Sequence, residues 1–298
     1  MAQRPEGTPK VGRPRSAPKV LPMDAIARSR AATDRSFPGL RAFYRLLFLV
    51  VLSTQCTPVH ASAERAFGQT HARYAAALSN FVKNGRVDYA GLQSAPQDLD
   101  AYLNDLARVT PEEFATWSRE NRLALLLNLY NAQTLRLILD HYPLKSIRDI
   151  GTLPAAAWRE LVARFGGQIM TLDHLENKII RPDYDEPRVH FALVCAANGC
   201  PPLRSEPYVG DRLDEQLDDQ AKQFLAIVEK NHFDVAQNTL WLSPIFKWYK
   251  EDFTGKAGSL AAYVKPFLPQ ESRRALERSS KLKVLHTNYD WNLNEQTR

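Results

Sequence analysis

The segment from Glu120 to His141 constrains the fold most, because its apolar residues cover more than one side of a helix. The main apolar set keeps helical spacing from Leu123 to Ile138, and further leucines fall on the other faces, at Leu125, Leu129 and Leu135. Tyr142-Pro143 ends the pattern. A helix that is apolar on most sides must be covered on most sides, so we expect it at the centre of a domain.

Two asparagines, Asn128 and Asn131, interrupt the apolar surface of this helix. Buried amides need hydrogen-bond partners. These two either bond to the backbone of a neighbouring segment or face a cavity, and the sequence favours neither. Both are therefore candidate pocket residues.

The rest of the chain alternates between amphipathic helices and short extended runs. We expect helices at 64–81, 99–106, 158–165, 171–181, 213–230, 244–253, 260–268 and 272–280, and strands at 168–170, 189–196, 239–243 and 283–286. Helices dominate early and strands cluster late. This order predicts an α+β fold, with helices before and around a small, mostly antiparallel sheet.

The first 63 residues differ from the rest of the chain. They hold ten Lys and Arg against three Asp and Glu, followed by the apolar run 46–52 and the small-residue site Ala61-Ser62-Ala63. This order predicts a basic presequence and a signal peptide over 1–63, with Met23 as an alternative start. The apolar run is too short to cross a bilayer, which takes roughly 20 apolar residues. We expect export to the periplasm or the extracellular space, with membrane association only if the signal stays attached.

The positive charge of the chain lies in this presequence. The whole chain has 39 Lys and Arg against 33 Asp and Glu, a net charge of +6. Without the first 63 residues, 29 basic and 30 acidic residues remain, a net charge of −1. Residues 64–298 therefore predict a single domain with no basic surface for nucleic acid and no membrane span of its own.

The segment from His190 to Cys200 carries the strongest chemical signal. It predicts a buried strand that starts at a histidine and ends in the turn Asn198-Gly199, just before a cysteine. A histidine can lower the pKa of a thiol or accept its proton, so Cys200 is the candidate nucleophile and His190 its base. Cys195, within the strand, is expected to be a packed thiol.

Two other interpretations use the same residues. In an exported protein, Cys195 and Cys200 could form a structural disulfide. A zinc site built from both cysteines, His190 and His174 is weakly indicated, because the spacing is unlike that of known zinc sites. We expect no metal and no cofactor.

A catalytic base also needs an orienting group, and we assign Glu176 to that role. Pro201 and Pro202 lack N–H groups, so an oxyanion hole would need the Cys200 N–H and a side chain, with Asn131 or Asn128 as candidates. A tight hairpin at Asn198-Gly199 would leave His190 on the order of 23 Å from Cys200 at strand rise. The pair can react only if the chain after Gly199 folds back.

Five segments together resemble a known family, the domain of unknown function 547: Asn128–Ala132, Leu172–Arg181, Val189–Leu203, Ser243–Tyr249 and Tyr289–Asn294. They extend over nearly all of the chain that follows the presequence. The resemblance implies a papain-like cysteine-protease fold in a single domain over 64–298. It also implies a triad of Glu176, His190 and Cys200, and it agrees with export.

The sequence thus predicts an exported thiol enzyme that cleaves or transfers amide or thioester groups of a peptide or small molecule. One alternative is a non-catalytic domain that binds a peptide or small thiol in the same pocket. The other is a Cys195–Cys200 disulfide with no catalytic site.

Overall fold

The computed structural model describes residues 67–279 and 281–297, which belong to one compact unit, Ala61–Arg298. The predicted presequence and signal peptide lie outside the described residues. The unit combines many helices with small sheets, so the α+β prediction is confirmed.

The α-helices are α1 Ala72–Phe81, α2 Tyr89–Ser94, α3 Gln97–Arg108, α4 Pro111–Ala115, α5 Arg119–His141, α6 Leu172–His174, α7 Arg181–Tyr184, α8 Val189–Ala192, α9 Leu213–Leu225, α10 Ile245–Trp248, α11 Lys250–Ala257, α12 Leu260–Val264 and α13 Gln270–Glu277. Short 3-10 helices are η2 Ile147–Asp149, η3 Ala156–Arg159, η5 Gly210–Arg212 and η6 Lys265–Phe267, and η4 Leu175–Ile180 is a π-helical turn. The strands are β1 Val82–Lys83, β2 Arg86–Val87, β3 Leu161–Phe165, β4 Gln168–Thr171, β5 His232–Asp234, β6 Thr239–Leu242 and β7 Lys283–His286.

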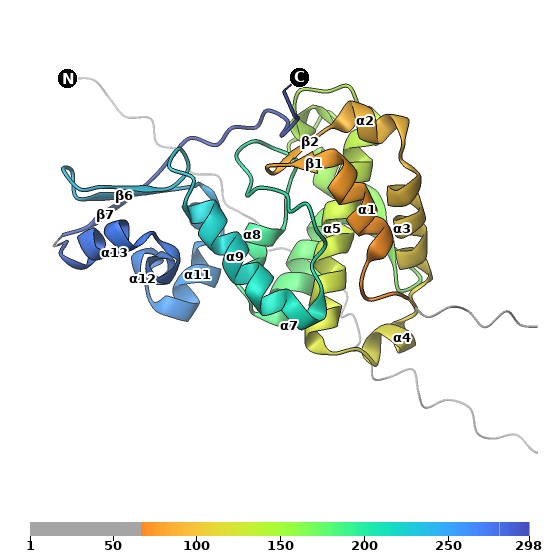
Figure 1. Cartoon of the computed structure of the whole chain (residues 1–298), viewed down its shortest axis with the longest axis horizontal. Coiled ribbons are helices and arrows are strands. Elements are labelled where there is room, and N and C mark those ends of the chain that lie inside the picture. The colour runs from red at the N-terminus through yellow and green to blue at the C-terminus, as the bar shows by residue number, and fades with distance from the viewer. Residues whose placement is uncertain (1–66, 280, 298) are drawn as a thin grey trace, which may run out of the picture. The chain divides into compact units, whose positions relative to one another are not determined.

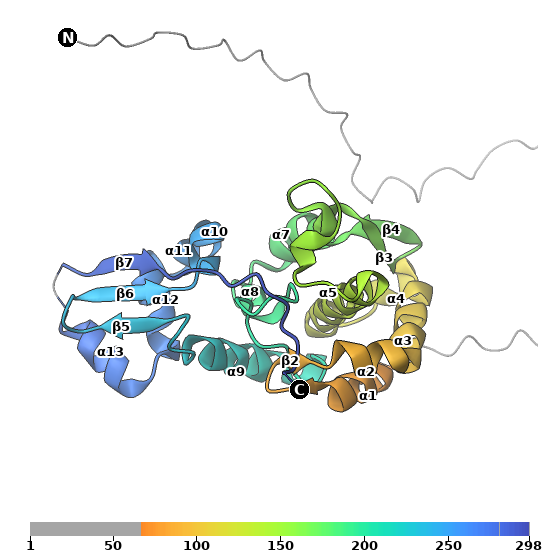
Figure 2. The same ribbon diagram turned by 90° about the horizontal axis from the view of Figure 1, so that it is seen from above.

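Helix α5 is the centre of the larger hydrophobic core, as its sequence predicts. Ser118 caps its first turn by accepting a hydrogen bond from the Asn121 N–H, and its side chains are buried almost continuously from Leu123 to Leu139. Seen from above, α5 lies between α1–α3 on one side and the β3–β4 hairpin with α7 on the other (Figure 2). Its apolar faces are therefore covered all round.

A second, smaller core lies between α9 and the segments that follow it. Strands β5 and β6 pair antiparallel, β6 and β7 pair parallel, and α10–α13 gather with this sheet at the end away from α5 (Figure 1 and Figure 2). Helix α9 contributes Leu213 and Leu217 to the larger core and Phe224 to the smaller one. It therefore joins the two cores.

The helix predicted over 158–165 is wrong. Residues 156–159 form the 3-10 helix η3, and 161–165 form strand β3, which pairs antiparallel with β4 around Gly166 and Gly167. Both glycines have positive φ, 59° and 72°, which closes a tight hairpin turn. Ala163 and Phe165 are buried, and Arg164 between them is exposed, so the segment has strand periodicity.

The strand predicted over 189–196 is also wrong. Residues 189–192 form helix α8, and the chain then extends from Leu193 outside the sheets. The turn begins before the helix, because the Val189 and His190 N–H groups donate to the Glu186 and Pro187 carbonyls. Phe191 enters the smaller core, whereas Val189 and Ala192 enter the larger one. A helical turn sends side chains to both cores at once, which explains why β-branched and aromatic residues are helical here.

The side-chain amides of Asn128 and Asn131 each bond the backbone of a neighbouring segment, with the NH2 group as donor and the oxygen as acceptor. Asn131 Nδ2 donates to the Ala192 carbonyl and its Oδ1 accepts from the Val194 N–H, both at 2.9 Å. Asn128 makes the same pair of bonds with the Tyr208 backbone, at 2.8 and 2.9 Å. The extended segment after α8 is thus held by a side chain of α5 in place of a strand partner.

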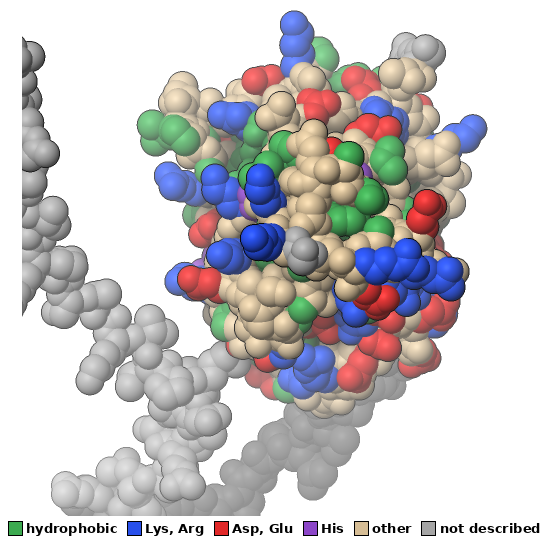
Figure 3. All heavy atoms as spheres, turned by 90° about the vertical axis from the view of Figure 1, so that its left-hand side faces the viewer, with side chains coloured by type: hydrophobic (Ala, Val, Ile, Leu, Met, Phe, Trp, Pro, Cys, Tyr) green, Lys and Arg blue, Asp and Glu red, His purple; other side chains and the backbone are tan. Residues whose placement is uncertain are grey.

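Among residues 67–279 and 281–297, no helix is long and apolar enough to cross a membrane. On the face that Figure 3 shows, basic and acidic side chains are interspersed with apolar ones.

Replacing Asn131 with Ala should lower the free energy of unfolding by about 3 kcal/mol, because two buried backbone groups, at Ala192 and Val194, lose their partner. Urea unfolding followed by circular dichroism measures the change. Asn104, exposed on α3, provides the matched control, and Asn104→Ala should change stability by less than about 0.5 kcal/mol. Equal effects of the two substitutions would contradict the structural role of Asn131.

Candidate functional site

A cavity of about 250 Å³ collects most of the residues that the sequence singles out. His190, Cys195, Cys200 and Glu176 all line it. The remaining wall is largely aromatic and comes from α5, η3, α10 and the C-terminal segment, with Tyr130, Trp158, Trp248, Tyr249, Tyr289 and Trp291. The chain after Gly199 thus returns to the cavity that His190 lines, which is the condition for a site at this pair.

Cys195 and Cys200 are joined by a disulfide, with their Cα atoms 6.3 Å apart. Cys200 is 2% exposed and Cys195 is half-buried. The Cys195 N–H donates to Cys200 Sγ at 3.0 Å, and the Tyr289 hydroxyl lies 3.2 Å from both sulfurs. In this oxidised state, neither sulfur is a nucleophile.

The turn that carries Cys200 is held by the C-terminal segment. The Asn198 and Gly199 N–H groups donate to the Asn292 and Asp290 carbonyls at 2.8 and 2.7 Å. A side chain at position 199 would meet the Tyr289 ring at 2.8 Å, so only glycine allows this close approach. The Asn-Gly pair therefore sets the position of the turn and of Tyr289 together.

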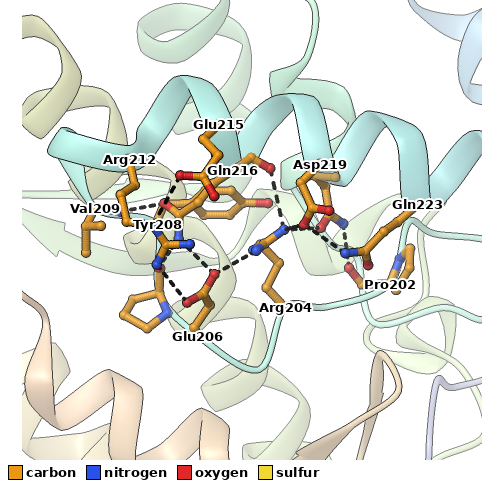
Figure 4. A network of polar contacts seen from close by, with 12 residues as sticks. Pro202, Arg204, Glu206, Tyr208, Val209, Arg212, Glu215, Gln216, Asp219 and Gln223 are labelled. Atoms are coloured by element: carbon orange, nitrogen blue, oxygen red, sulfur yellow. Dashed lines mark hydrogen bonds and ion pairs between the residues drawn. The ribbon is translucent and has the colours of Figure 1, made fainter. Parts of the chain in front are cut away.

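A polar network fixes the chain after the turn onto α9 (Figure 4). Gln220 Nε2 donates to the Pro202 carbonyl at 2.7 Å, and Gln216 bonds both the Pro207 carbonyl and the Val209 N–H at 2.9 Å. Arg204 pairs with Glu206 and Asp219 in the same network. Both glutamines are buried, so their bonds hold the loop where water does not compete.

The carboxylate on the His190 imidazole is Asp252, not Glu176. Asp252 Oδ2 lies 2.7 Å from His190 Nε2, and Arg181 donates to both Asp252 oxygens at 2.8 Å. The hydrogen bonds from His190 and Arg181 hold the pKa of Asp252 well below its usual range. Because the ionised carboxylate can only accept, the proton on Nε2 belongs to the imidazole.

Glu176 reaches the imidazole only through Tyr249. The Tyr249 ring stacks on His190, with centroids 3.8 Å apart and planes at 20°. Tyr249 and Tyr130 both interact with the carboxylate of Glu176, which is 6% exposed. Burial, followed by the negative charge of Glu176, raises the pKa of both tyrosines. Glu176 thus lies in the cavity wall, one ring away from the predicted position.

Asn128 and Asn131 do not line this cavity, because their amides bond the backbone at Tyr208 and around Val194. The Cys200 N–H donates to the Ala197 carbonyl at 3.0 Å and closes the turn. The donors predicted for an oxyanion hole are therefore engaged elsewhere. The Tyr289 hydroxyl is a polar donor that the structure places at the sulfurs.

No group of three or more His, Cys, Asp or Glu side chains that could hold a metal ion occurs within the described part of the chain. His174, the fourth ligand of the zinc interpretation, is exposed on α6, whereas His190 is buried.

Three important residues of the site are absent from the sequence analysis as site residues: Asp252, Arg181 and Tyr249. Arg181 and Tyr249 end two of the segments that carry the family resemblance, and Tyr289 begins another. Asp252 follows the Ser243–Tyr249 segment by three residues, in the first turn of α11. The position of these polar and aromatic residues at the ends of the family segments was the feature of the sequence that could have indicated a role in the site.

Residues 114–225 match a family described as "Protein of unknown function, DUF547". The match includes the central helix, the Leu172–Arg181 segment and the turn with both cysteines, so the predicted resemblance to this family is confirmed. No curated protein and no solved structure matches the chain.

Asp252→Asn tests the charge at the imidazole. Because the pKa of Asp252 is lowered in the folded state, its ion pair stabilises the fold above its ordinary pKa and is lost as the pH falls through the lowered one. The variant should therefore be less stable than the wild type at pH 7, and the difference should shrink below about pH 4. Urea unfolding across this pH range measures it.

Asp183→Asn is the control, because Asp183 is exposed on α7 and forms no ion pair with the described residues. Its stability difference from the wild type should depend little on pH. A difference for Asp252→Asn that stays constant from pH 7 to pH 3 would contradict the assigned ion pair.

Proposed function

We propose that the protein is a thiol-dependent enzyme that cleaves or transfers amide or thioester groups, with Cys200 as nucleophile, His190 as base and Asp252 as the orienting carboxylate. The observation that carries the proposal is the hydrogen bond between His190 and Asp252 in a cavity that Cys200 also lines. A cysteine, an imidazole and an acid that orients the imidazole are the parts that nucleophilic acyl transfer requires.

The protonation of His190 supports its role as base. Its Nε2–H donates to Asp252, so the neutral ring has its lone pair on Nδ1. Nδ1 makes no hydrogen bond with the residues that the structure describes. The imidazole can therefore accept a proton from a thiol in the cavity, and the Asp252 charge stabilises the imidazolium that forms.

The nucleophile becomes available when a small thiol reduces the disulfide. The reductant attacks Cys195, the more exposed sulfur, and the electrons of the S–S bond leave with Cys200 as a thiolate. A second reductant thiol releases Cys195 and forms the reductant disulfide. The Cys195 N–H and the Tyr289 hydroxyl, both directed at Cys200 Sγ, stabilise the thiolate.

In the reduced enzyme, the Cys200 thiol passes its proton to His190, the thiolate attacks the acyl carbon, and the leaving amine or thiol takes that proton from the His190 imidazolium. Water or another acceptor, deprotonated by the same imidazole, releases the acyl group. Burial, followed by the Glu176 charge, raises the pKa of Tyr289, so its hydroxyl stays protonated and can donate to the oxyanion.

The papain-like form of the α+β fold and the export of the protein belong to the same proposal. The buried central helix and a cysteine and histidine on one cavity support the first. The basic and apolar composition of residues 1–63 supports the second. The substrate would be a peptide or a small molecule that reaches a cavity of this size.

The disulfide itself favours a second candidate, a non-catalytic domain that binds a ligand in the same cavity. In that case, the disulfide only closes the turn. The two candidates differ in what happens when Cys195 is removed.

Cys195→Ser should alkylate rapidly with iodoacetamide at Cys200 below pH 7 without reductant, because Cys200 loses its disulfide partner. Wild type should react only after reduction. A further His190→Ala substitution should slow alkylation at pH 6 by about tenfold or more, since the thiol loses its base. Mass spectrometry of the labelled peptide measures the rates.

Hydrolysis of acyl thioesters should follow the same pattern, with activity in Cys195→Ser and none in Cys200→Ser. The second variant is the matched control, because it removes the other half of the same disulfide. Ordinary thiol reactivity of Cys200 in Cys195→Ser, unchanged by His190→Ala, would favour the binding domain and overturn the enzyme.

A further inference from the structure

We propose that the cavity binds the positively charged ammonium group of its substrate through its aromatic rings and Glu176. The inference names a substrate class for the thiol enzyme and rests on that proposed function for the reaction, although not for the binding.

The aromatic residues form a continuous wall. The Tyr289 ring lies 4.8 Å from Trp248 and 4.6 Å from Trp291, and Trp248 and Trp291 are 5.9 Å apart between centroids. Trp158 meets Trp291 edge-on at 6.2 Å. At these distances the rings pack against one another and form one wall of the cavity, and the ring faces on that wall are electron-rich surfaces that attract ammonium ions.

Several of these rings are free to take a cation. Arg148 lies over Trp291 and Arg181 over Tyr249, each about 5 Å from the ring centroid. No Lys or Arg of the described residues lies over Trp158, Trp248 or Tyr289. Trp248 is 48% exposed, which is unusual for so large an apolar side chain and makes its ring accessible to a ligand.

The acidic side chains that line the cavity are complementary to a positively charged ligand. Its charged lining residues, within the described part of the chain, are Asp173 and Glu176, and no Lys or Arg lines it. Asp252 is balanced by Arg181, but Glu176 forms none of the ion pairs found between the described residues. A buried carboxylate that forms no direct ion pair with the described residues favours a cationic partner in the cavity.

The wall also connects to the reactive sulfurs. Tyr289 contacts Trp248 and Trp291 with its ring and both cysteine sulfurs with its hydroxyl. A cation on this wall would lie one side chain away from Cys200. A substrate whose ammonium group binds there would have its acyl group close to Cys200. The positive charge would also stabilise the Cys200 thiolate.

Choline and 3,3-dimethylbutan-1-ol test the inference, because they have the same shape and differ in charge. Each is titrated into the native, unreduced protein with tryptophan fluorescence as the signal, and sodium chloride keeps the ionic strength constant. We expect choline to bind about tenfold more tightly than the neutral alcohol. Equal affinity for the two probes would overturn the proposal.

Two substitutions locate the site. Trp248→Leu and Glu176→Gln should each weaken choline binding by about fivefold or more, because the first removes an aromatic face and the second a carboxylate from the cavity lining. Trp241→Leu is the control, since Trp241 lies in β6 outside the cavity and should leave the affinity unchanged. Choline affinity unchanged in both cavity variants would also overturn the proposal.

The same probes separate this inference from the proposed reaction. Cys200→Ser cannot turn over, yet it should bind choline as the wild type does. Choline binding in a protein whose Cys200 shows no activation would overturn the enzyme alone. An activated Cys200 with no preference for choline over its neutral isostere would overturn the cation site alone.

Discussion

The site depends on the pair of hydrogen bonds between Asn131 and the backbone around Val194. Helix α5 is buried over most of its length, and the segment with His190 and Cys195 lies outside the sheets. A single amide satisfies a carbonyl and an N–H that the missing strand pairing would leave without partners. These bonds fix α8 and the segment that follows it, which line the cavity, to the buried helix α5.

The second constraint is the cost of taking two carboxylates out of water, Asp252 in part and Glu176 almost completely. Asp252 is held by Arg181 and His190, which makes it an orienting group with a fixed charge. Glu176 lies beside the Tyr130 and Tyr249 hydroxyls and forms none of the ion pairs found between the described residues. The two carboxylates thus differ in their surroundings: Asp252 bonds the imidazole, and Glu176 lines the cavity.

The central helix, strands β6 and β7 and the turn at Asn198-Gly199 follow closely from the sequence, because apolar spacing and the Asn-Gly pair are local signals. Two segments do not follow. Residues 158–165 have too few residues to separate a helix from a hairpin strand, and the two glycines after them decide the question. Residues 189–192 have the composition of a strand, but Phe191 and Val189 must enter different cores. Tertiary packing overrides the local preference there.

The sequence by itself predicted a site of His190, Cys200 and Glu176 and a buried helix at the centre of the domain, and these three residues line one cavity. Only the tertiary structure decided which acid contacts the imidazole, because Asp252 lies 62 residues from His190 and meets it through the packing of α11. It also decided that the two asparagines serve the backbone and that the aromatic residues close one wall. Contacts of this kind depend on how two cores join, and no local pattern of residues records that.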